Sequence, residues 1–284
     1  MSTEESTPER PTDGTSAPRE PHADSRLDSQ TGSSSESQAD SQADSQTDSQ
    51  TDSQAESQEW LDDPQYREAV IDLLGALAYG ELTAFTRLAG DSDLAPTQPL
   101  RAAVAGLAVA EFRHYECLVK RLEEMGADPE AAMAPFIVAV DSFHERTRPS
   151  TWLEGLVKAY VGDGIATDFY REISAYVDPS TAALVHDVMQ DVGQAEFVVK
   201  MVREAIKADE RVAGRLALWG RRLVGEALSQ AQQVAVERDA LSSLLVGGVG
   251  AQDRPSADLA ELGRMFARLT DEHTRRMGRL GLAA

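Results

Sequence analysis

A carboxylate and an imidazole three residues apart are the most informative pair of side chains in this sequence. Glu111 precedes His114 within a run whose apolar spacing is typical of a helix. Residues three apart on an α-helix project from the same face, so both side chains can bind one metal ion. The alternative is an ordinary polar helix surface, with Arg113 and Lys120 nearby. The metal hypothesis therefore depends on whether other helices supply further ligands.

Two other helical segments offer such ligands. In helical bundles that bind two metal ions through carboxylates, two helices each contribute a Glu, and the other two each contribute a Glu-x-x-His. Glu81 has apolar neighbours, and a carboxylate buried among them is costly unless it is paired or metal-bound. Asp163 and Asp168 differ by five positions in a later segment, so we expect only one of them to be a ligand. The alternatives are that Glu81 reaches solvent, that Asp163 caps a bend and that Asp168 pairs with Arg171.

A fourth segment carries an altered copy of the motif. Asp191 and Gln194 have the spacing of Glu-x-x-His, and a Glu follows two residues later in both copies. Gln coordinates only through its carbonyl oxygen, which is a weaker and harder donor than imidazole, so a second ion would be held less well. The candidate metal ligands are Glu81, Glu111, His114, Asp163, Asp168, Asp191 and Gln194.

The elements that must position these side chains are helices. From Trp60 onward Ala, Leu, Val, Glu and Arg dominate, Gly and Pro are sparse, and no segment alternates as a strand would. We therefore predict an all-α fold, a four-helix bundle with additional helices. The Gly- and Pro-containing breaks predict helices over 64–88, 100–124, 129–146, 151–176, 179–207, 212–245 and 255–279.

The first 58 residues differ in composition from the remainder. They contain almost no large apolar side chains and repeat Asp-Ser-Gln with a period of four. Such a segment cannot bury enough apolar surface to offset the entropy lost on ordering. We predict a disordered acidic tail over 1–58 and one helical domain over 59–284. The tail carries 13 acidic residues and 3 Arg, and the whole chain carries −21, so about half of the net charge lies in each part.

The net charge and the cysteine content indicate which partners the protein could bind and in which cellular compartment we expect it. A general nucleic-acid surface needs clustered Lys and Arg to replace counterions, and an acidic chain argues against one, although a local basic patch leaves tRNA open. Cys117 is the only cysteine, which fits a reducing cytoplasm. The N-terminus has no apolar signal core, and no run approaches 18 uncharged apolar residues. We expect a cytoplasmic protein without membrane association.

The block Leu107-Ala108-Val109-Ala110-Glu111-Phe112-Arg113-His114-Tyr115-Glu116 resembles the MiaE-like family of ferritin-like proteins, in its actinobacterial type. The resemblance covers about residues 64–205 in helix order and motif spacing. It implies a ferritin-like bundle and an iron cofactor, a di-iron centre in the family. It also implies O₂-dependent hydroxylation, which MiaE-type enzymes carry out on the isopentenyl side chain of a modified tRNA adenosine.

The sequence departs from the family at the altered motif copy. The family pattern there is Glu-x-x-His, where this chain has Asp191 and Gln194, so a single bound metal is an alternative to two. The implied substrate is a small molecule or a modified nucleoside. A second hypothesis is a non-catalytic ferritin-like scaffold or interaction protein with a degenerate metal site. The oligomeric state stays open, with a homo-oligomer among the alternatives.

Overall fold

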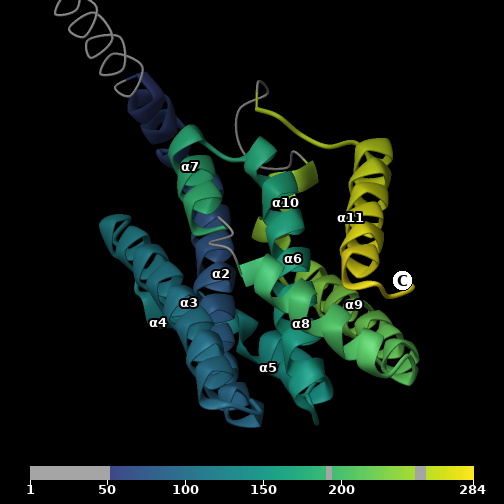
Figure 1. The fold of residues 1–284 in the computed structure, drawn as a ribbon. Coiled ribbons are helices and arrows are strands. Elements are labelled where there is room, and N and C mark those ends of the chain that lie inside the picture. Colours follow the sequence, from purple (N-terminus) through teal and green to yellow (C-terminus); the bar gives the residue numbers. More distant parts are fainter. Residues whose placement is uncertain (1–51, 190–193, 247–253) are drawn as a thin grey trace, which may run out of the picture. The chain divides into compact units, whose positions relative to one another are not determined.

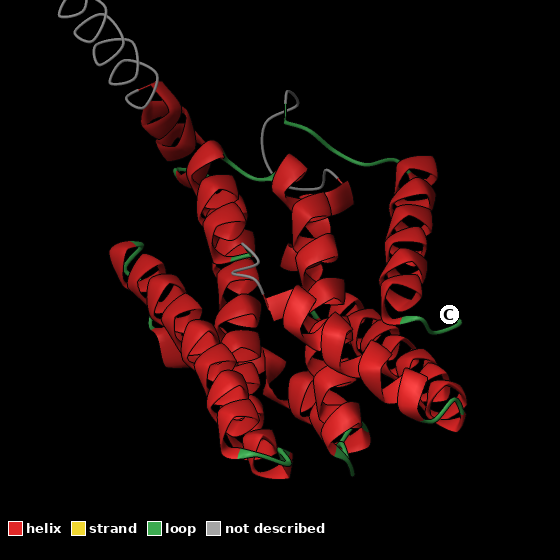
Figure 2. Ribbon diagram, in the orientation of Figure 1, coloured by secondary structure: helices red, strands yellow, loops and turns green. Residues whose placement is uncertain are grey.

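The computed structural model describes residues 52–189, 194–246 and 254–284, and these contain only helices and their connections (Figure 2). The predicted all-α class is therefore confirmed over the described residues. Short 3₁₀ turns cover Ser92–Leu94, Ala134–Phe136 and Ser174–Tyr176. The labelled helices are α2 (Pro64–Asp91), α3 (Gln98–Glu124), α4 (Pro129–Met133), α5 (Ile137–Arg146), α6 (Trp152–Ile173), α7 (Pro179–Val188), α8 (Gln194–Ala208), α9 (Arg211–Glu237), α10 (Asp239–Val246) and α11 (Leu259–Leu280).

Side-chain caps explain where the long helices begin. Asp63 accepts a hydrogen bond from the backbone N–H of Gln65 at the start of α2, and Pro64 occupies the first turn, where its missing N–H is not needed. Asp178 caps α7 in the same way. Thr151 caps α6 through the N–H of Glu154. These local signals are why the predicted helix starts lie close to the observed ones.

Three of the predicted helices are divided in the structure. Residues 129–146 form α4 and α5, because Pro135 lies between them and cannot donate a helical hydrogen bond. Residues 179–207 contain α7 and α8, and residues 212–245 contain α9 and most of α10. The last break is at Arg238, whose backbone leaves the helical region while its guanidinium binds the buried carboxylate of Asp72 at 2.5 and 2.9 Å.

The packed region begins before residue 59. Residues 52–61 form a helix ahead of α2, and Ser57 is buried. The Ser57 hydroxyl accepts a hydrogen bond of 3.0 Å from the N–H of Ser180 at the start of α7. The predicted boundary at residue 58 therefore lies within a helix. The rest of the predicted tail, residues 1–51, lies outside the described residues.

The described segment Pro64–Leu94 is long and apolar enough, by length and composition alone, to cross a membrane. The mean hydropathy of its most apolar window is 1.3, and 56% of that window is buried within the protein. Buried core helices have the same properties, and α2 supplies much of an apolar core. The segment is accordingly weak evidence for a membrane span.

Apolar side chains form two separate core clusters. The first involves α2, α3, α4, α6, α7 and α10, and the second involves α2, α3, α6, α8, α9 and α11, as these helices are labelled in Figure 1. Along α2, α3 and α6 the buried members change from one cluster to the other at 79–87, 109–117 and 162–172. These three intervals, which we call the polar layer, contain every candidate ligand predicted on those helices.

Members of the first cluster include Tyr66, Val70, Leu73, Leu74, Leu77, Ala78, Leu118, Leu122, Ile173, Val185, Val188 and Leu244. Members of the second include Leu88, Val104, Ala108, Leu156, Val157, Val161, Val198, Val202, Leu216, Leu223, Met277 and Leu280.

Candidate metal centre

Glu81, Glu111 and His114 converge within the polar layer. Helices α2 and α3 are consecutive and lie side by side (Figure 1), so the one carboxylate on α2 faces the pair on α3. One ligand atom from each of the three lies within 4.8 Å of the others. His114 Nδ1 is 3.4 Å from Glu81 Oε2 and 3.6 Å from Glu111 Oε2. Two ligands that each lie about 2.1 Å from one ion are roughly 3.0–3.4 Å apart. The distance to Glu81 falls at the end of this range and the distance to Glu111 slightly exceeds it, so small side-chain movements would bring the three donors onto one ion.

The two carboxylates are buried without a permanent cation. Glu81 is 9% exposed and Glu111 is 5% exposed. Among the described residues, neither forms an ion pair with Lys or Arg, and Glu81 Oε2 is buried without a hydrogen-bond partner. Buried charges are normally paired or bound to metal. The donor chemistry, two carboxylates and one imidazole, is of the kind found at iron, manganese and zinc sites.

The pKa shifts of Glu81, Glu111 and His114 indicate which protons a bound cation would displace. Burial, and then the neighbouring Glu111, raise the pKa of Glu81 well above its ordinary value. Burial is the largest single influence on Glu111 and acts in the same direction, but the contacts with His114 and Glu81 together outweigh it, and the pKa of Glu111 is lowered. Contacts with Glu111 and Glu81 raise the pKa of His114 to about 10. Without metal, protons on Glu81 and His114 thus neutralise the site, and a bound ion would displace them.

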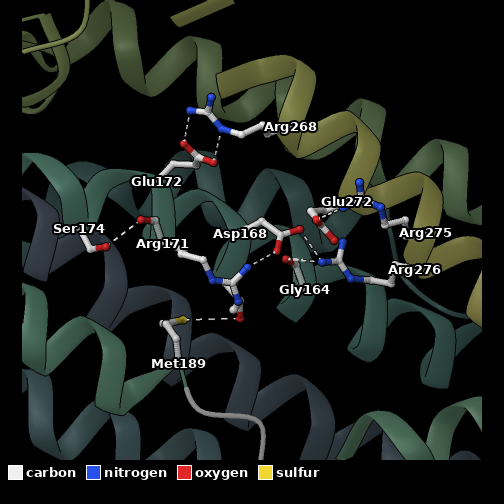
Figure 3. Close-up of polar contacts among 11 residues, drawn as sticks. Gly164, Asp168, Arg171, Glu172, Ser174, Met189, Arg268, Glu272, Arg275 and Arg276 are labelled. Carbon is white, nitrogen blue, oxygen red and sulfur yellow. Dashed lines mark hydrogen bonds and ion pairs between the residues drawn. The ribbon is translucent and has the colours of Figure 1, made fainter. Parts of the chain in front are cut away.

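Asp168 on α6 lies in the same layer but is already paired. It is 6% exposed and accepts from Arg171 Nη1 at 3.2 Å and from Arg276 Nη2 at 2.5 Å (Figure 3). Pairing with Arg171 was the alternative left open by the sequence, whereas the pairing with Arg276 was not anticipated. Asp163 is exposed, so α6 presents one buried and one exposed carboxylate.

The altered motif copy falls mostly outside the described residues. Asp191 is not described, and of Gln194 the structure describes only the backbone, as the first residue of α8. Their predicted role as ligands stays a prediction, as do the ligand roles of the other candidates.

A cavity of about 300 Å³ lies between Glu111 on α3 and Asp168 on α6. Glu111 and His114 line it from α3, Asp168 from α6, and Arg276 from α11. Arg276 was not among the predicted site residues. A signal for it was present in the sequence, because it follows His273 by three residues and precedes Met277, and both are buried on one stripe of the amphipathic α11.

Comparison with known proteins supports the ferritin-like part of the resemblance. The sequence matches the family described as "Ferritin-like domain, actinomycetes" over residues 64–248. A solved structure of a Synechococcus protein with aldehyde deformylating oxidase activity is similar, with a TM-score of 0.58 and 18% identity, covering 78% of this chain and 93% of that chain. At this identity the likeness supports the fold alone. A search of curated proteins found no match. The family match includes α2, α3 and α6 and ends before α11; the chain belongs to the ferritin-like domain family of actinomycetes.

Proposed function

We propose that this chain is a ferritin-like non-heme iron protein that resembles MiaE-type O₂-dependent hydroxylases and binds its metal through Glu81, Glu111 and His114. The observation that carries the proposal is the cluster of these three side chains, which we call the triad: both carboxylates are buried and His114 is half-buried. Three donor atoms lie within 4.8 Å of one another, and Oε2 of Glu81 is buried without a hydrogen-bond partner among the described residues. A site of this composition is stabilised by a cation, since two adjacent buried carboxylates repel each other.

Iron bound at this triad would supply the O₂-dependent oxidation chemistry. The two carboxylates hold the ion and balance its charge, and His114 contributes a neutral nitrogen once its proton has left. Tyr170 lies on the adjoining α6, where desolvation and then the charge of Glu81 raise the pKa of its phenol above the ordinary value. Tyr170 therefore stays protonated beside the site and can donate a hydrogen bond.

The cavity limits the proposed substrate. A volume of about 300 Å³ is at the lower end of the range for small-molecule sites, which is roughly 300–1,000 Å³. We propose a small organic molecule, or the side chain of a modified nucleoside, as the oxidised group. The acidic net charge of −21 favours the free small molecule over a nucleic acid.

A non-catalytic scaffold is the second candidate function. The observation that favours it is the pairing of Asp168 with Arg276 and Arg171, which removes one carboxylate from the ligand set of a complete di-metal site. A scaffold retains the bundle and its cores but shows no O₂-dependent turnover.

The experiment that tests the proposal measures metal per chain after purification from iron-supplemented culture, together with thermal unfolding during anaerobic Fe(II) titration. We expect the wild-type chain to bind iron and gain about 2.7 kcal/mol of stability at an Fe(II) concentration of 100 Kd. Glu111→Gln and His114→Ala should lose both effects. Glu116→Gln is the matched control, since Glu116 is exposed on the same helix. A wild-type chain without metal, whose melting temperature ignores Fe(II), contradicts the proposal.

O₂ consumption by the iron-loaded chain separates the two candidates. Turnover that requires Glu111 and His114 supports the oxygenase. Iron binding without O₂ consumption, given a reductant and a panel of small substrates, supports the scaffold.

A further inference from the structure

The α6 side of the cavity contains a fixed positive charge. Arg276 reaches across from α11 and donates from Nη2 to Asp168 Oδ2 at 2.5 Å and to the carbonyl oxygen of Gly164 at 2.9 Å (Figure 3). Its side chain is 10% exposed, so the guanidinium is largely withdrawn from water. Two contacts on one helix fix its position against α6.

Gly164 makes this close approach sterically feasible. A Cβ atom at residue 164 would lie 2.0 Å from Nε and 2.3 Å from Cζ of Arg276, which is well inside van der Waals contact. Any larger residue at this position would push the guanidinium away from the helix. The sequence therefore has a glycine in mid-helix, despite its cost of up to about 1 kcal/mol relative to Ala, at the place where Arg276 lies.

A second arginine of α11, Arg268, also binds α6. Arg268 lies two turns before Arg276 and binds both carboxylate oxygens of Glu172, at 2.8 and 2.6 Å (Figure 3). Glu172 follows Asp168 by one turn on α6. The two arginines of α11 thus pair with two acids of α6, and α11 lies beyond the matched family region.

A second metal ion does not fit beside this arrangement. An ion bound by Asp168 would have to displace Arg276, and the guanidinium would then be buried close to another cation without its carboxylate partner. Like charges a few ångströms apart in a partly desolvated site repel strongly. The neighbouring triad is the opposite case, since its carboxylates have no Lys or Arg partner among the described residues.

We propose that Arg276 takes the place of a second metal ion, so that the cavity binds one ion, at Glu81, Glu111 and His114, and the α6 carboxylate is occupied by the guanidinium. The position of the single ion rests on the proposed function, whereas the exclusion of metal from Asp168 does not.

The experiment measures Mn(II) and anaerobic Fe(II) bound per chain, by equilibrium dialysis with metal analysis, for the full-length protein and four variants. The variants are Arg276→Met, Asp168→Asn, the double variant with both changes, and Arg275→Met as the matched control, because Arg275 is exposed on the same helix. We expect one ion in the wild type, in Asp168→Asn and in Arg275→Met. Arg276→Met should gain a second ion, bound at least tenfold more weakly, and the double variant should lose it.

Two results would overturn the inference: a wild-type chain that binds an ion lost in Asp168→Asn, or an Arg276→Met variant that folds but gains no Asp168-dependent ion. If the wild type binds no ion at all, the proposed function is refuted instead. The comparison of Arg276→Met with the double variant then still decides the role of Arg276. If circular dichroism shows that Arg276→Met does not fold, Asp168→Asn in the wild-type background decides alone. Unchanged metal content then supports the inference, and a lost ion refutes it.

Discussion

The buried carboxylates of the polar layer have different partners on its α2–α3 side and on its α6 side. On the α2–α3 side, Glu81 and Glu111 face one imidazole and lack an Arg or Lys partner among the described residues. On the α6 side, Asp168 is held between Arg171 and Arg276 (Figure 3). Both sides lie between the same two apolar clusters, so burial alone does not distinguish them. The difference is the source of the positive charge. On the α6 side it is the guanidinium of Arg276, whereas on the α2–α3 side it is a proton or, under the proposed function, a metal ion.

This difference indicates which side can respond to its surroundings. A guanidinium stays charged at any physiological pH, so the Asp168 side keeps one state. Protons neutralise the cluster of Glu81, Glu111 and His114, and under the proposed function a bound ion does so too. The stability of this side should therefore depend on pH and on metal. Substitutions on the two sides should accordingly differ in size, in sign and in their dependence on metal.

The largest expected effect is on the α6 side. Asp168→Ala leaves Arg276 buried without its carboxylate, and breaking a buried pair in this way typically destabilises a protein by about 3–5 kcal/mol. We expect a loss of about 3 kcal/mol in the free energy of unfolding, measured with urea, whether or not metal is present. Asp163→Ala, at an exposed position of the same helix, should lose less than about 1 kcal/mol. Equal losses in the two variants would mean that the Arg276 pair does not hold α6 and α11 together.

An intermediate effect is expected from pH on the metal-free triad. Glu111 and Glu81 raise the pKa of His114 to about 10, above the value of about 6.5 expected in the unfolded chain. The folded state therefore binds this proton more tightly, and the stability it contributes is complete below about pH 6.5 and lost as the pH rises towards 10.

The measurement is urea unfolding of chelator-treated protein at about pH 6 and pH 9, for the wild type and His114→Gln. The wild type should lose on the order of 1 kcal/mol more than the variant over this interval, because a pair at the edge of a cavity is partly screened. Metal affinity should change in the opposite direction and increase with pH, since the ion competes with the His114 proton. Parallel pH curves for the two proteins would contradict the ion pairing of His114.

The smallest effect, and the only one of favourable sign, is expected at Glu81. Burial raises the pKa of this carboxyl, so folding near neutral pH must protonate a side chain that is ionised in the unfolded chain, which costs free energy. Glu81→Gln keeps a neutral side chain of nearly the same shape without that cost and should stabilise the metal-free protein by at most about 1 kcal/mol, on the scale at which a change in pKa converts into free energy, while it weakens metal binding. Unfolding with chelator and with excess Fe(II) measures both. A clear destabilisation of the metal-free variant would show that the carboxylate is compensated in the absence of metal.

Local sequence signals predicted most of the helices, and contacts between distant residues account for the differences. Asp63, Thr151 and Asp178 cap helices through neighbouring backbone groups, so composition and spacing were enough to find them. The division between α9 and α10 occurs where Arg238 binds Asp72, 166 positions away. No local pattern contains that contact.

In the candidate site, too, local patterns predicted some residues and a contact between distant residues was missed. Glu111 and His114 share a helix face because of helical periodicity, and Glu81 follows because consecutive long helices pack against each other. The choice between Asp163 and Asp168 could not be made from spacing. Spacing could not show the pairing of Asp168 with Arg276 either, because Arg276 is 108 positions away in the sequence.

The position of the polar layer along three helices has a mechanical consequence. On α2 the flanking cluster members Ala78 and Leu88 are about 15 Å apart along the helix axis, at 1.5 Å per residue. The segment of α2 that carries Glu81 is therefore packed into an apolar cluster at each of its two ends. The corresponding segments of α3 and α6 are packed in the same way. Fraying at one end of the bundle should bend such a stretch much less than it would bend a helix anchored at one end only. The distances between the donor atoms are thus held by packing that none of the donor residues provides.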